Sequence, residues 1–402
     1  MNGVVVYVCN AEFPTGSAYS SRVLNFCRLF KDLDYKPIVV SDYADRTFSS
    51  LDSSQYQSFE SISFITIGNQ SFNYRYFKRK KVVIKAISSI LSASAGIPVF
   101  IIVAERDFPI YNRIKKEFED KATLILEACE WYDVSSYKFS YLDPRYIMFS
   151  KYMKHIYPNC NNVIAISSFL ENYFSKKNSL YGKNIIRIPT ILDTKKHVFS
   201  LSSQTNSNRI VLMFAGSYSG NGKEDFKELF LALSQYNEKC PFVLKIYGIS
   251  KQDYLSISKA NEKQSHVIDN CVQFMGKLSQ KEIYIEYTKA DYSVIIRPDR
   301  RSSNAGFPTK LAESLSAGTP VIANLTGDLG MYIVNGENGF IIEKTASDIK
   351  RCLDQIVSLT LEQKERMREK ARKTAELCFD YRIYENEMGS FLRIANGGNN
   401  DK

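Results

Sequence analysis

The stretch RPDRRSSNAGFPTKLAESLSAGTPVIAN, residues 297–324, contains a basic loop, a short helix-like run and an apolar strand in close succession. Pro308 stands where the helix is expected to begin. Proline is tolerated in a first helical turn because the N–H that it lacks would have no partner inside the helix. The first N–H groups of a helix attract phosphate oxygens, and Lys310 adds a full positive charge there. The stretch therefore predicts a phosphate-binding helix start behind a loop with three arginines.

Glu313 follows Lys310 by three residues, so the two side chains share one face of this helix. A carboxylate is poorly suited to phosphate, but it accepts hydrogen bonds from a pair of vicinal hydroxyls such as those of a ribose. Gly306 allows the backbone to approach a ligand closely. Taken alone, the letters PTKLAE indicate an ordinary surface helix with a solvated Glu313. The surrounding sequence favours the ligand-binding interpretation.

Strand-like and helix-like segments alternate along the chain, with one interruption. Residues 194–208, TKKHVFSLSSQTNSN, lose the periodicity and are rich in Ser, Asn and Thr, as is typical of a linker. Before it, strand-like runs occupy residues 3–9, 36–42, 62–67, 97–105, 122–130, 161–167 and 185–189, and helix-like runs occupy 21–35, 108–121 and 167–177. After it, strand-like runs occupy 209–217, 242–248, 272–276, 292–298 and 320–324, and helix-like runs occupy 223–236, 252–263, 280–290, 309–318 and 347–359.

This pattern predicts two Rossmann-like α/β domains, and a chain of 402 residues is long enough for two cores. The expected boundaries are 1–192 and 193–379, with a C-terminal helix over 380–398 that crosses back to the first domain. Open α/β sheets bind ligands at the carboxyl ends of their strands. Two such edges that face each other would form a cleft suited to a nucleotide-linked substrate.

The composition is that of a globular protein, with 44% hydrophobic and 24% charged residues. No long uncharged apolar run predicts a transmembrane helix, and the N-terminus lacks the basic start of a signal peptide. The eight cysteines form no C-x-x-C pair and the three histidines lie far apart, so no zinc site is predicted. Buried, reduced cysteines fit a cytoplasmic protein.

Two further strand-to-helix turns carry glycine and lysine. The stretch FAGSYSGNGKEDF places Gly216 and Ser217 after a strand and Lys223 before a helix, which indicates a second phosphate cradle. The turn Gly276-Lys277-Leu278 presents a backbone edge suited to a nucleobase. Each signal is weak alone because glycine-rich turns between strands and helices are common.

The order of the segments FAGSYSGNGK, LKIYG, VQFMGKLS, ADYSVIIRP, GFPTKLAESLSAGTPVIAN and IVNGENGFII resembles the C-terminal domain of the group 1 glycosyltransferases of family 4. The segment FPTGSAYSSRVLNFCRLFKDLDYKPIVVS, which contains Gly16, is similar to the first glycine loop and helix of that family. The resemblance implies the GT-B fold, in which two Rossmann-like domains face each other across a cleft. It also implies transfer of a sugar from a nucleoside-diphosphate sugar to an acceptor hydroxyl.

The resemblance assigns the donor side residue by residue. Glu313 matches the second of two family glutamates and would hold the ribose, whereas the first falls on Ala305, so the backbone of Gly306 or Phe307, or Asn304, would replace its contact to the sugar. Lys223 matches the family lysine of the glycine loop, and the family arginine falls near Ser217, so its charge would come from Arg297, Arg300 or Arg301. The expected donor-binding residues are Gly16, Gly216, Ser217, Lys223, Lys277, Arg297, Arg301, Asn304, Gly306, Phe307, Thr309, Lys310 and Glu313.

The expected catalytic residues are Glu130, Lys223 and Lys310. Glu130 stands in LILEACEWYD where the family has a histidine, and Asp133 is an alternative; both acids are equally compatible with a structural role. The two lysines would stabilise the charge that develops on the leaving diphosphate. A D-x-D motif in a suitable loop, which would indicate a metal site, is not present. No cofactor is implied because the nucleotide sugar is a substrate. The resemblance implies that the anomeric configuration is retained, as it mostly is in the family.

The formal net charge of +10 is compatible with nucleic acid, an anionic membrane or an anionic small substrate. Residues 74–94, YRYFKRKKVVIKAISSILSAS, are basic and amphipathic if helical. They predict either a contact with the inner face of the membrane or a core helix with a solvated basic face. No nucleic-acid partner is expected because no recognisable reading motif is present.

The sequence thus predicts a cytoplasmic, peripheral glycosyltransferase that acts on a glycan or lipid-linked acceptor in the synthesis of a surface polysaccharide. Two alternatives stay open. A nucleotide-sugar epimerase of the same fold would interconvert the sugar without an acceptor. A non-catalytic protein would bind the nucleotide sugar, as the loss of the acid at Ala305 allows.

Overall fold

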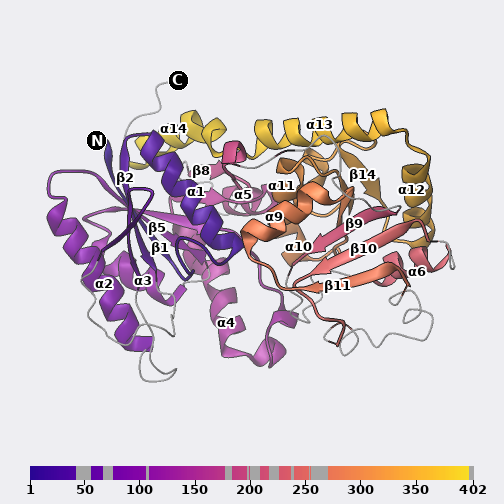
Figure 1. Cartoon of the computed structure of the whole chain (residues 1–402). Helices are drawn as coiled ribbons and strands as arrows, with labels where there is room; N and C mark the ends of the chain where they lie inside the picture. The colour runs from indigo at the N-terminus through magenta and orange to yellow at the C-terminus, as the bar shows by residue number, and fades with distance from the viewer. Residues whose placement is uncertain are drawn as a thin grey trace. The chain divides into compact units, whose positions relative to one another are not determined.

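The computed structural model describes residues 1–41, 56–66, 76–105, 108–176, 183–196, 199, 209–216, 226–236, 240–252, 254 and 270–397. It divides into two compact units (Figure 1). The first consists of Met1–Leu192 together with Tyr381–Lys402, and the second of Asp193–Asp380. The chain therefore leaves the first unit and returns to it.

The first unit is built on an eight-stranded sheet with the order β3-β4-β2-β1-β5-β6-β7-β8. Its strands are β1 Gly3–Cys9, β2 Tyr35–Ser41, β3 Gln57–Phe59, β4 Ile62–Thr66, β5 Val99–Ala104, β6 Thr123–Ala128, β7 Asn162–Ala165 and β8 Asn184–Arg187. All neighbours pair in parallel except β3, which is antiparallel to β4. The central strand β1 is buried along its whole length, as its uninterrupted apolar run predicts.

The helices of this unit are α1 Ala18–Asp32, α2 Tyr76–Ala93, α3 Phe108–Phe118, α4 Pro144–Lys151 and α5 Ser168–Lys176. Short turns, η2 Val134–Ser136 and η3 Ser140–Leu142, precede α4. Helix α1 begins after Ser17, whose side chain accepts a hydrogen bond from the Ser20 N–H. Phe26 and Phe30 of α1 are fully buried. Helix α1 therefore covers part of the sheet and keeps its first turn at the sheet's carboxyl edge.

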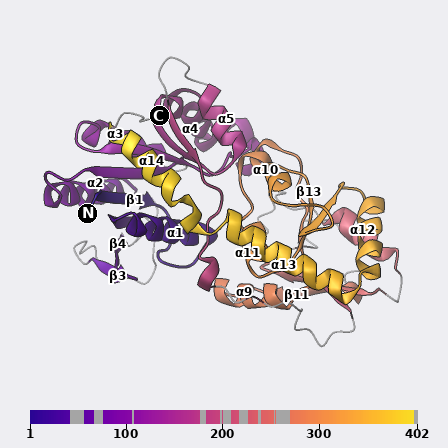
Figure 2. The same ribbon diagram turned by 90° about the horizontal axis from the view of Figure 1, so that it is seen from above.

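The C-terminal segment contributes to the first core. Helix α14, Glu385–Ala395, is drawn in yellow across the first unit in Figure 2 and packs against β8. The side chain of Asn184 donates a hydrogen bond to the Phe391 carbonyl at 2.8 Å. Met388, Phe391 and Leu392 are buried in the same cluster as residues of β1 and α1. The last helix is thus an integral part of the first unit.

The second unit contains a six-stranded parallel sheet with the order β11-β10-β9-β12-β13-β14. Its strands are β9 Ile210–Ala215, β10 Phe242–Tyr247, β11 Val272–Gly276, β12 Tyr292–Ile295, β13 Val321–Asn324 and β14 Gly339–Ile342. Its helices are α6 Lys227–Ser234, α9 Gln280–Lys289, α10 Arg301–Ala305, α11 Thr309–Ser316, α12 Ala346–Ser358 and α13 Leu361–Cys378. Both sheets and their flanking helices agree with the predicted α/β class.

Some local predictions differ from the structure. The basic loop before Pro308 contains the helix α10, and Pro308 itself is the cap that precedes α11 rather than a residue of its first turn. Strands β3 and β14 and helix α4 were not predicted. Most of the helix predicted at 252–263, and most of the linker predicted at 194–208, lie outside the described residues.

Within the described part of the chain, none of the helices is long and apolar enough to cross a membrane. Seven of the eight cysteines are buried, and Cys378 is half-buried.

Candidate functional site

Three glycines meet at the carboxyl edge of the second sheet. Gly216 follows β9, Gly248 follows β10 and Gly276 ends β11. The Gly216 N–H donates to the Tyr247 carbonyl at 3.1 Å, and the Gly248 N–H donates to the Gly276 carbonyl at 2.7 Å. Gly248 has a φ of +87°, and a Cβ added there would lie 2.5 Å from the Gly216 carbonyl oxygen. Glycine at position 248 therefore allows the ends of β9 and β10 to approach each other.

Lys310 in the first turn of α11 reaches this glycine edge. Its Nζ lies 4.1 Å from the centre of the Phe214 ring and would lie 3.3 Å from a Cβ added to Gly216. The first N–H groups of α11 have no acceptor within the helix, so its start carries partial positive charge. The structure thus places the ammonium group of Lys310 beside Gly216 at the end of β9.

Glu313 lies one turn after Lys310 on α11 and is oriented by a neighbouring helix. Gln280, the first residue of α9, donates a hydrogen bond from Nε2 to Oε1 of Glu313 at 3.1 Å. Burial raises the pKa of the Glu313 carboxyl, while the Gln280 hydrogen bond and the charge of Lys310 oppose the rise. The side chain is half-buried, and its hydrogen bond to Gln280 is exposed. Its hydrogen-bond partner Gln280 was not predicted, because nothing local in the sequence marks a contact 33 residues away.

We expect ligand binding at Glu313 to depend on pH. A carboxyl whose pKa is raised in the folded state becomes protonated at a higher pH than usual. Its protonated form stabilises the fold at low pH, and that contribution is lost as pH rises through the folded pKa. Hydroxyl recognition needs the ionised form, so the affinity for a ribonucleotide should fall as pH decreases through that same pKa. A titration series over pH should show this, and Glu313→Gln should remove most of the dependence.

The helices that carry these groups are fixed at their other ends by two arginines of α13. Arg368 is buried and donates to the carbonyls of Thr288 and Ala290 at the end of α9, at 3.0 and 2.7 Å. Arg372 donates to the Ser316 carbonyl at the end of α11 at 2.6 Å. A cation at a helix C-terminus also complements the helix dipole. Burial lowers the pKa of Arg368 to about 10, so it stays charged at neutral pH.

The loop after β12 is cross-linked by side chains that the sequence assigned to the donor. Arg297 is buried, and its Nη1 donates to the Ser303 carbonyl at 3.0 Å. Asn304 donates to Asp299 at 2.8 Å and accepts the Gly327 N–H at 2.7 Å. Arg297 and Asn304 therefore shape the loop, so any contact with a donor comes in addition to these bonds.

Gly306, Phe307 and Asn304 were predicted to replace the missing acid at Ala305, and they differ in whether their polar groups already form hydrogen bonds. Ala305 itself is fully buried. The Gly306 N–H donates to the Ser302 carbonyl at 3.1 Å, and Asn304 is bonded as above. Within the described residues no hydrogen bond is recorded for the Phe307 N–H, while the Phe307 ring packs edge-on against Tyr332 and Phe379. Of the three, the Phe307 backbone is thus the best placed to meet a ligand.

The remaining predicted donor residues are placed as follows. Thr309 is the first residue of α11 and is half-buried. Lys277 and Arg301 are exposed, the first in the turn after β11 and the second at the start of α10. Ser217 and Lys223 lie outside the described residues. The structure therefore brings Gly216, Lys310 and Glu313 to one edge of the second sheet.

The sequence of this unit is similar to that of a known family. Residues 196–374 match the family model described as glycosyl transferases group 1. The match covers almost the whole of Asp193–Asp380 and includes Gly216, Lys310 and Glu313. No curated protein matched the chain.

Solved structures of similar fold cover the whole chain. A sucrose-phosphate synthase from Thermosynechococcus elongatus aligns with a TM-score of 0.74 at 15% identity over 98% of this chain and 99% of that one. A glycosyltransferase from Rickettsia africae aligns with a TM-score of 0.67 at 16% identity over 99% and 100%. The Anabaena protein HepE in complex with UDP-glucose aligns with a TM-score of 0.65 at 14% identity over 98% and 100%. The chain therefore has the GT-B fold of glycosyltransferases, with a Rossmann-like sheet in each unit.

Two predicted residues lie in the first unit, outside the residues that match the family model. Gly16, with a φ of +119°, precedes α1, and Glu130 is half-buried after β6. The buried carboxylate of Glu105 accepts the backbone N–H groups of Cys129 and Glu130 at 2.9 and 3.2 Å. Glu105 thus fixes the backbone that presents Glu130. It was not predicted, although an acid directly after the apolar run 97–104 is the signal that marks it.

A buried ion pair lies at the carboxyl edge of the first sheet. Arg22 of α1 contacts Glu127 of β6 with an Nε–Oε1 distance of 2.7 Å, and both side chains are almost fully buried. Arg22 also donates to the carbonyls of Ile188 and Pro189. Tyr19 donates to the other Glu127 oxygen at 2.8 Å. The pair therefore joins the start of α1 to β6 and to the segment after β8.

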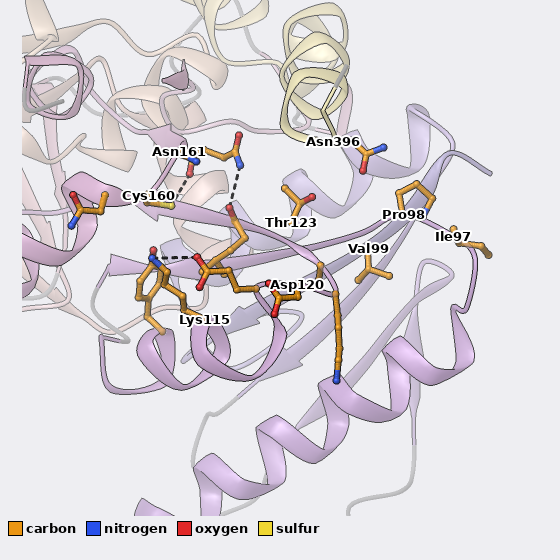
Figure 3. Close-up of a pocket in the computed structure, with 16 residues that line it drawn as sticks. Ile97, Pro98, Val99, Lys115, Asp120, Thr123, Cys160, Asn161 and Asn396 are labelled. Atoms are coloured by element: carbon orange, nitrogen blue, oxygen red, sulfur yellow. Dashed lines mark hydrogen bonds and ion pairs between the residues drawn. The ribbon is translucent and has the colours of Figure 1, made fainter. Parts of the chain in front are cut away.

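A cavity of about 410 Å³ opens at the opposite, amino edge of the first sheet (Figure 3). Its lining includes the first residues of β5, β6 and β7, namely Val99, Thr123 and Asn162, with Lys115 and Asn396 beside them. Ligands of open α/β sheets bind at the carboxyl ends of the strands. Within the first unit the cavity therefore lies at the end of the sheet opposite to Glu130, which follows β6.

Proposed function

We propose that this chain transfers a glycosyl group from a nucleoside-diphosphate sugar to an acceptor hydroxyl, with the donor bound by the second unit. The observation that carries the proposal is the position of Lys310 beside Gly216, with Glu313 one turn later on the same helix. A cation at a helix start suits a diphosphate. A carboxylate about one turn away suits the ribose hydroxyls. The match to the group 1 glycosyltransferases and the likeness to HepE, which was solved with UDP-glucose, support the same assignment.

In this proposal separate residues stabilise the leaving group, bind the donor and face the acceptor. Lys310, the start of α11 and Lys223 of the glycine loop stabilise negative charge as it grows on the leaving diphosphate, which lowers the barrier to C–O cleavage. Glu313, oriented by Gln280, binds the unchanged ribose. The Phe307 N–H contacts the donor sugar where the acid is replaced by Ala305. Glu130, fixed by Glu105, faces the acceptor.

We further propose that transfer is metal-independent and retains the anomeric configuration. In this proposal the charge of Lys310 and Lys223 neutralises the diphosphate in place of a metal. Among the described residues, no group of three or more His, Cys, Asp or Glu side chains is arranged to hold a metal ion. The acceptor is proposed to be a glycan or lipid-linked glycan of a surface polysaccharide, as the resemblance to family 4 implies, and the enzyme to work on the cytoplasmic side.

An assay on the intact chain tests the function. Thermal unfolding should shift upward with UDP or other nucleoside diphosphates, because a ligand that binds only the folded state stabilises it. With a nucleotide sugar and an acceptor glycan, transfer should proceed at nearly the same rate in excess chelator. Loss of activity that manganese or magnesium restores would refute metal independence.

The same assay separates the alternatives. Interconversion of the sugar without an acceptor would indicate an epimerase. A thermal shift with neither transfer nor hydrolysis across a panel of acceptors would indicate a binding protein. No shift with any nucleoside diphosphate would refute the proposed function.

A further inference from the structure

An exposed apolar surface lies between β6 and the end of α4 in the first unit. It consists of Phe139, Tyr141, Leu142, Ile147 and Met148, which come from η3, the residue before it and α4, and are named here the α4 surface. Leu142 is 82% exposed, Tyr141 67% and Phe139 61%. Large apolar side chains that gather exposed on one short segment indicate an interaction site. In Figure 1 this segment lies at the lower edge of the first unit, below its sheet.

The α4 surface is held on a packed base. Trp131 and Phe149 are buried and meet edge-on with ring centres 6.1 Å apart. Tyr146 packs against both Tyr137 and Tyr141, with ring centres 5.6 and 5.7 Å apart. The apolar residues are therefore displayed by an ordered scaffold, so little conformational entropy is lost when they bind a partner.

The charges around the α4 surface are mainly positive. Residues 131–160 contain Lys138, Arg145, Lys151 and Lys154, all exposed, but only two acids, Asp133 and Asp143. Asp143 is buried and paired with Arg145 at 2.8 Å. Apolar and aromatic side chains with a basic rim complement an anionic lipid surface, where rings lie at the head-group level and cations meet phosphate.

We propose that the α4 surface docks this protein onto anionic membranes. A second copy of the chain fits less well, because two identical basic rims would repel each other. The proposal moves the membrane contact away from residues 74–94. In α2 the apolar side chains Val83, Ile87 and Ile90 are buried in the first unit, while Lys81 and Lys85 are exposed. For its described side chains α2 is thus a core helix with a solvated basic face, and its apolar face would have to leave the core to insert.

Membrane docking rests on the proposed function in one respect, because it identifies the acceptor as lipid-linked. The α4 surface follows directly after Glu130 along the chain, at the carboxyl edge of β6. A surface there would hold the first unit against the bilayer in which such an acceptor is anchored. Binding to vesicles can be measured without any transfer, so the two proposals fail separately.

The test is co-sedimentation of the full chain with vesicles of phosphatidylcholine that contain phosphatidylglycerol. The double variant Phe139→Ser/Leu142→Ser should bind about a hundredfold more weakly, since each apolar side chain withdrawn from water contributes roughly tenfold or more. The matched control is Leu361→Ser/Leu377→Ser on α13, whose side chains are 68% and 63% exposed and lie in the other unit. The control should bind as the wild type does. The single tryptophan, Trp131, reports through its fluorescence whether the base of the α4 surface stays folded.

Two further measurements test whether charge contributes to vesicle binding and whether the partner is a membrane or a second copy of the chain. Lys138→Glu/Lys151→Glu should reduce binding to the anionic vesicles, and high salt should weaken the wild type in the same way. Failure of the wild type to bind anionic vesicles at low salt would overturn the proposal, as would equal binding by the folded Phe139→Ser/Leu142→Ser variant.

Sedimentation velocity tests self-association. If the wild type forms concentration-dependent dimers that this variant abolishes, and vesicle binding is unchanged, the surface serves self-association instead. Vesicle binding without any affinity for nucleoside diphosphates would refute the proposed glycosyl transfer but support membrane docking by the α4 surface.

Discussion

Replacing Lys310 with alanine should lower kcat for glycosyl transfer by about a hundred- to a thousandfold, the usual effect of removing one preorganised charge-stabilising group. The Lys310 ammonium lies beside Gly216 at the end of β9, where the leaving diphosphate is proposed to sit. Negative charge on that group grows in the transition state, so the loss should appear in kcat as well as in KM. Steady-state kinetics with varied donor and saturating acceptor measure both constants.

The matched control for this prediction is Lys373→Ala, because Lys373 is exposed on α13 of the same unit. It should leave both constants unchanged. Lys310 also covers the Phe214 ring at 4.1 Å, so the melting temperature of each variant should be measured beside its kinetics. A folded Lys310→Ala enzyme with wild-type kcat would contradict the assignment of Lys310 to the leaving group.

Replacing Glu127 with alanine should destabilise the first unit by about 3–5 kcal/mol, because removing one partner of a buried ion pair leaves the other charge uncompensated. Arg22 would keep its bonds to the Ile188 and Pro189 carbonyls but lose the carboxylate at 2.7 Å. Denaturant unfolding followed by Trp131, the only tryptophan and a residue of the first unit, measures the change.

A pair on the same helix provides the comparison. Arg28 of α1 contacts Glu60 at 2.8 Å, and both side chains are partly exposed. Partly exposed pairs contribute up to about 1 kcal/mol, so Glu60→Ala should cost much less than Glu127→Ala. If both variants lose the same free energy of unfolding, burial does not make the Arg22–Glu127 pair more important for stability than the exposed pair.

The repeating strands and helices could be predicted because their signals are local. The uninterrupted apolar run 3–9 coincides with β1, which is buried on both faces, and the run 272–276 coincides with β11. The start of α11 was predicted to within one residue from Pro308 and Lys310. Helix α10 was missed because RSSNA is short, polar and without apolar periodicity.

The contacts that orient the candidate site could not be predicted, because they join distant parts of the sequence. Gln280 and Glu313 are 33 residues apart, and Arg22 and Glu127 are 105 residues apart. Neither Gln280 nor Arg22 differs in its local sequence from a solvated helical residue. The tasks given to Arg297 and Asn304 likewise depended on the shape of the loop after β12, which the structure shows to be cross-linked by those two side chains.

The central claim, that α11 binds a nucleoside diphosphate with Glu313 on its ribose, is tested most directly by calorimetric titration of UDP into the wild type and Glu313→Ala. A hydrogen bond to a charged acceptor contributes about 1.5–3 kcal/mol. About 1.4 kcal/mol corresponds to a tenfold change in affinity. A folded Glu313→Ala protein should therefore bind UDP about ten- to a hundredfold more weakly than the wild type. Equal affinity of the two proteins for UDP would contradict it.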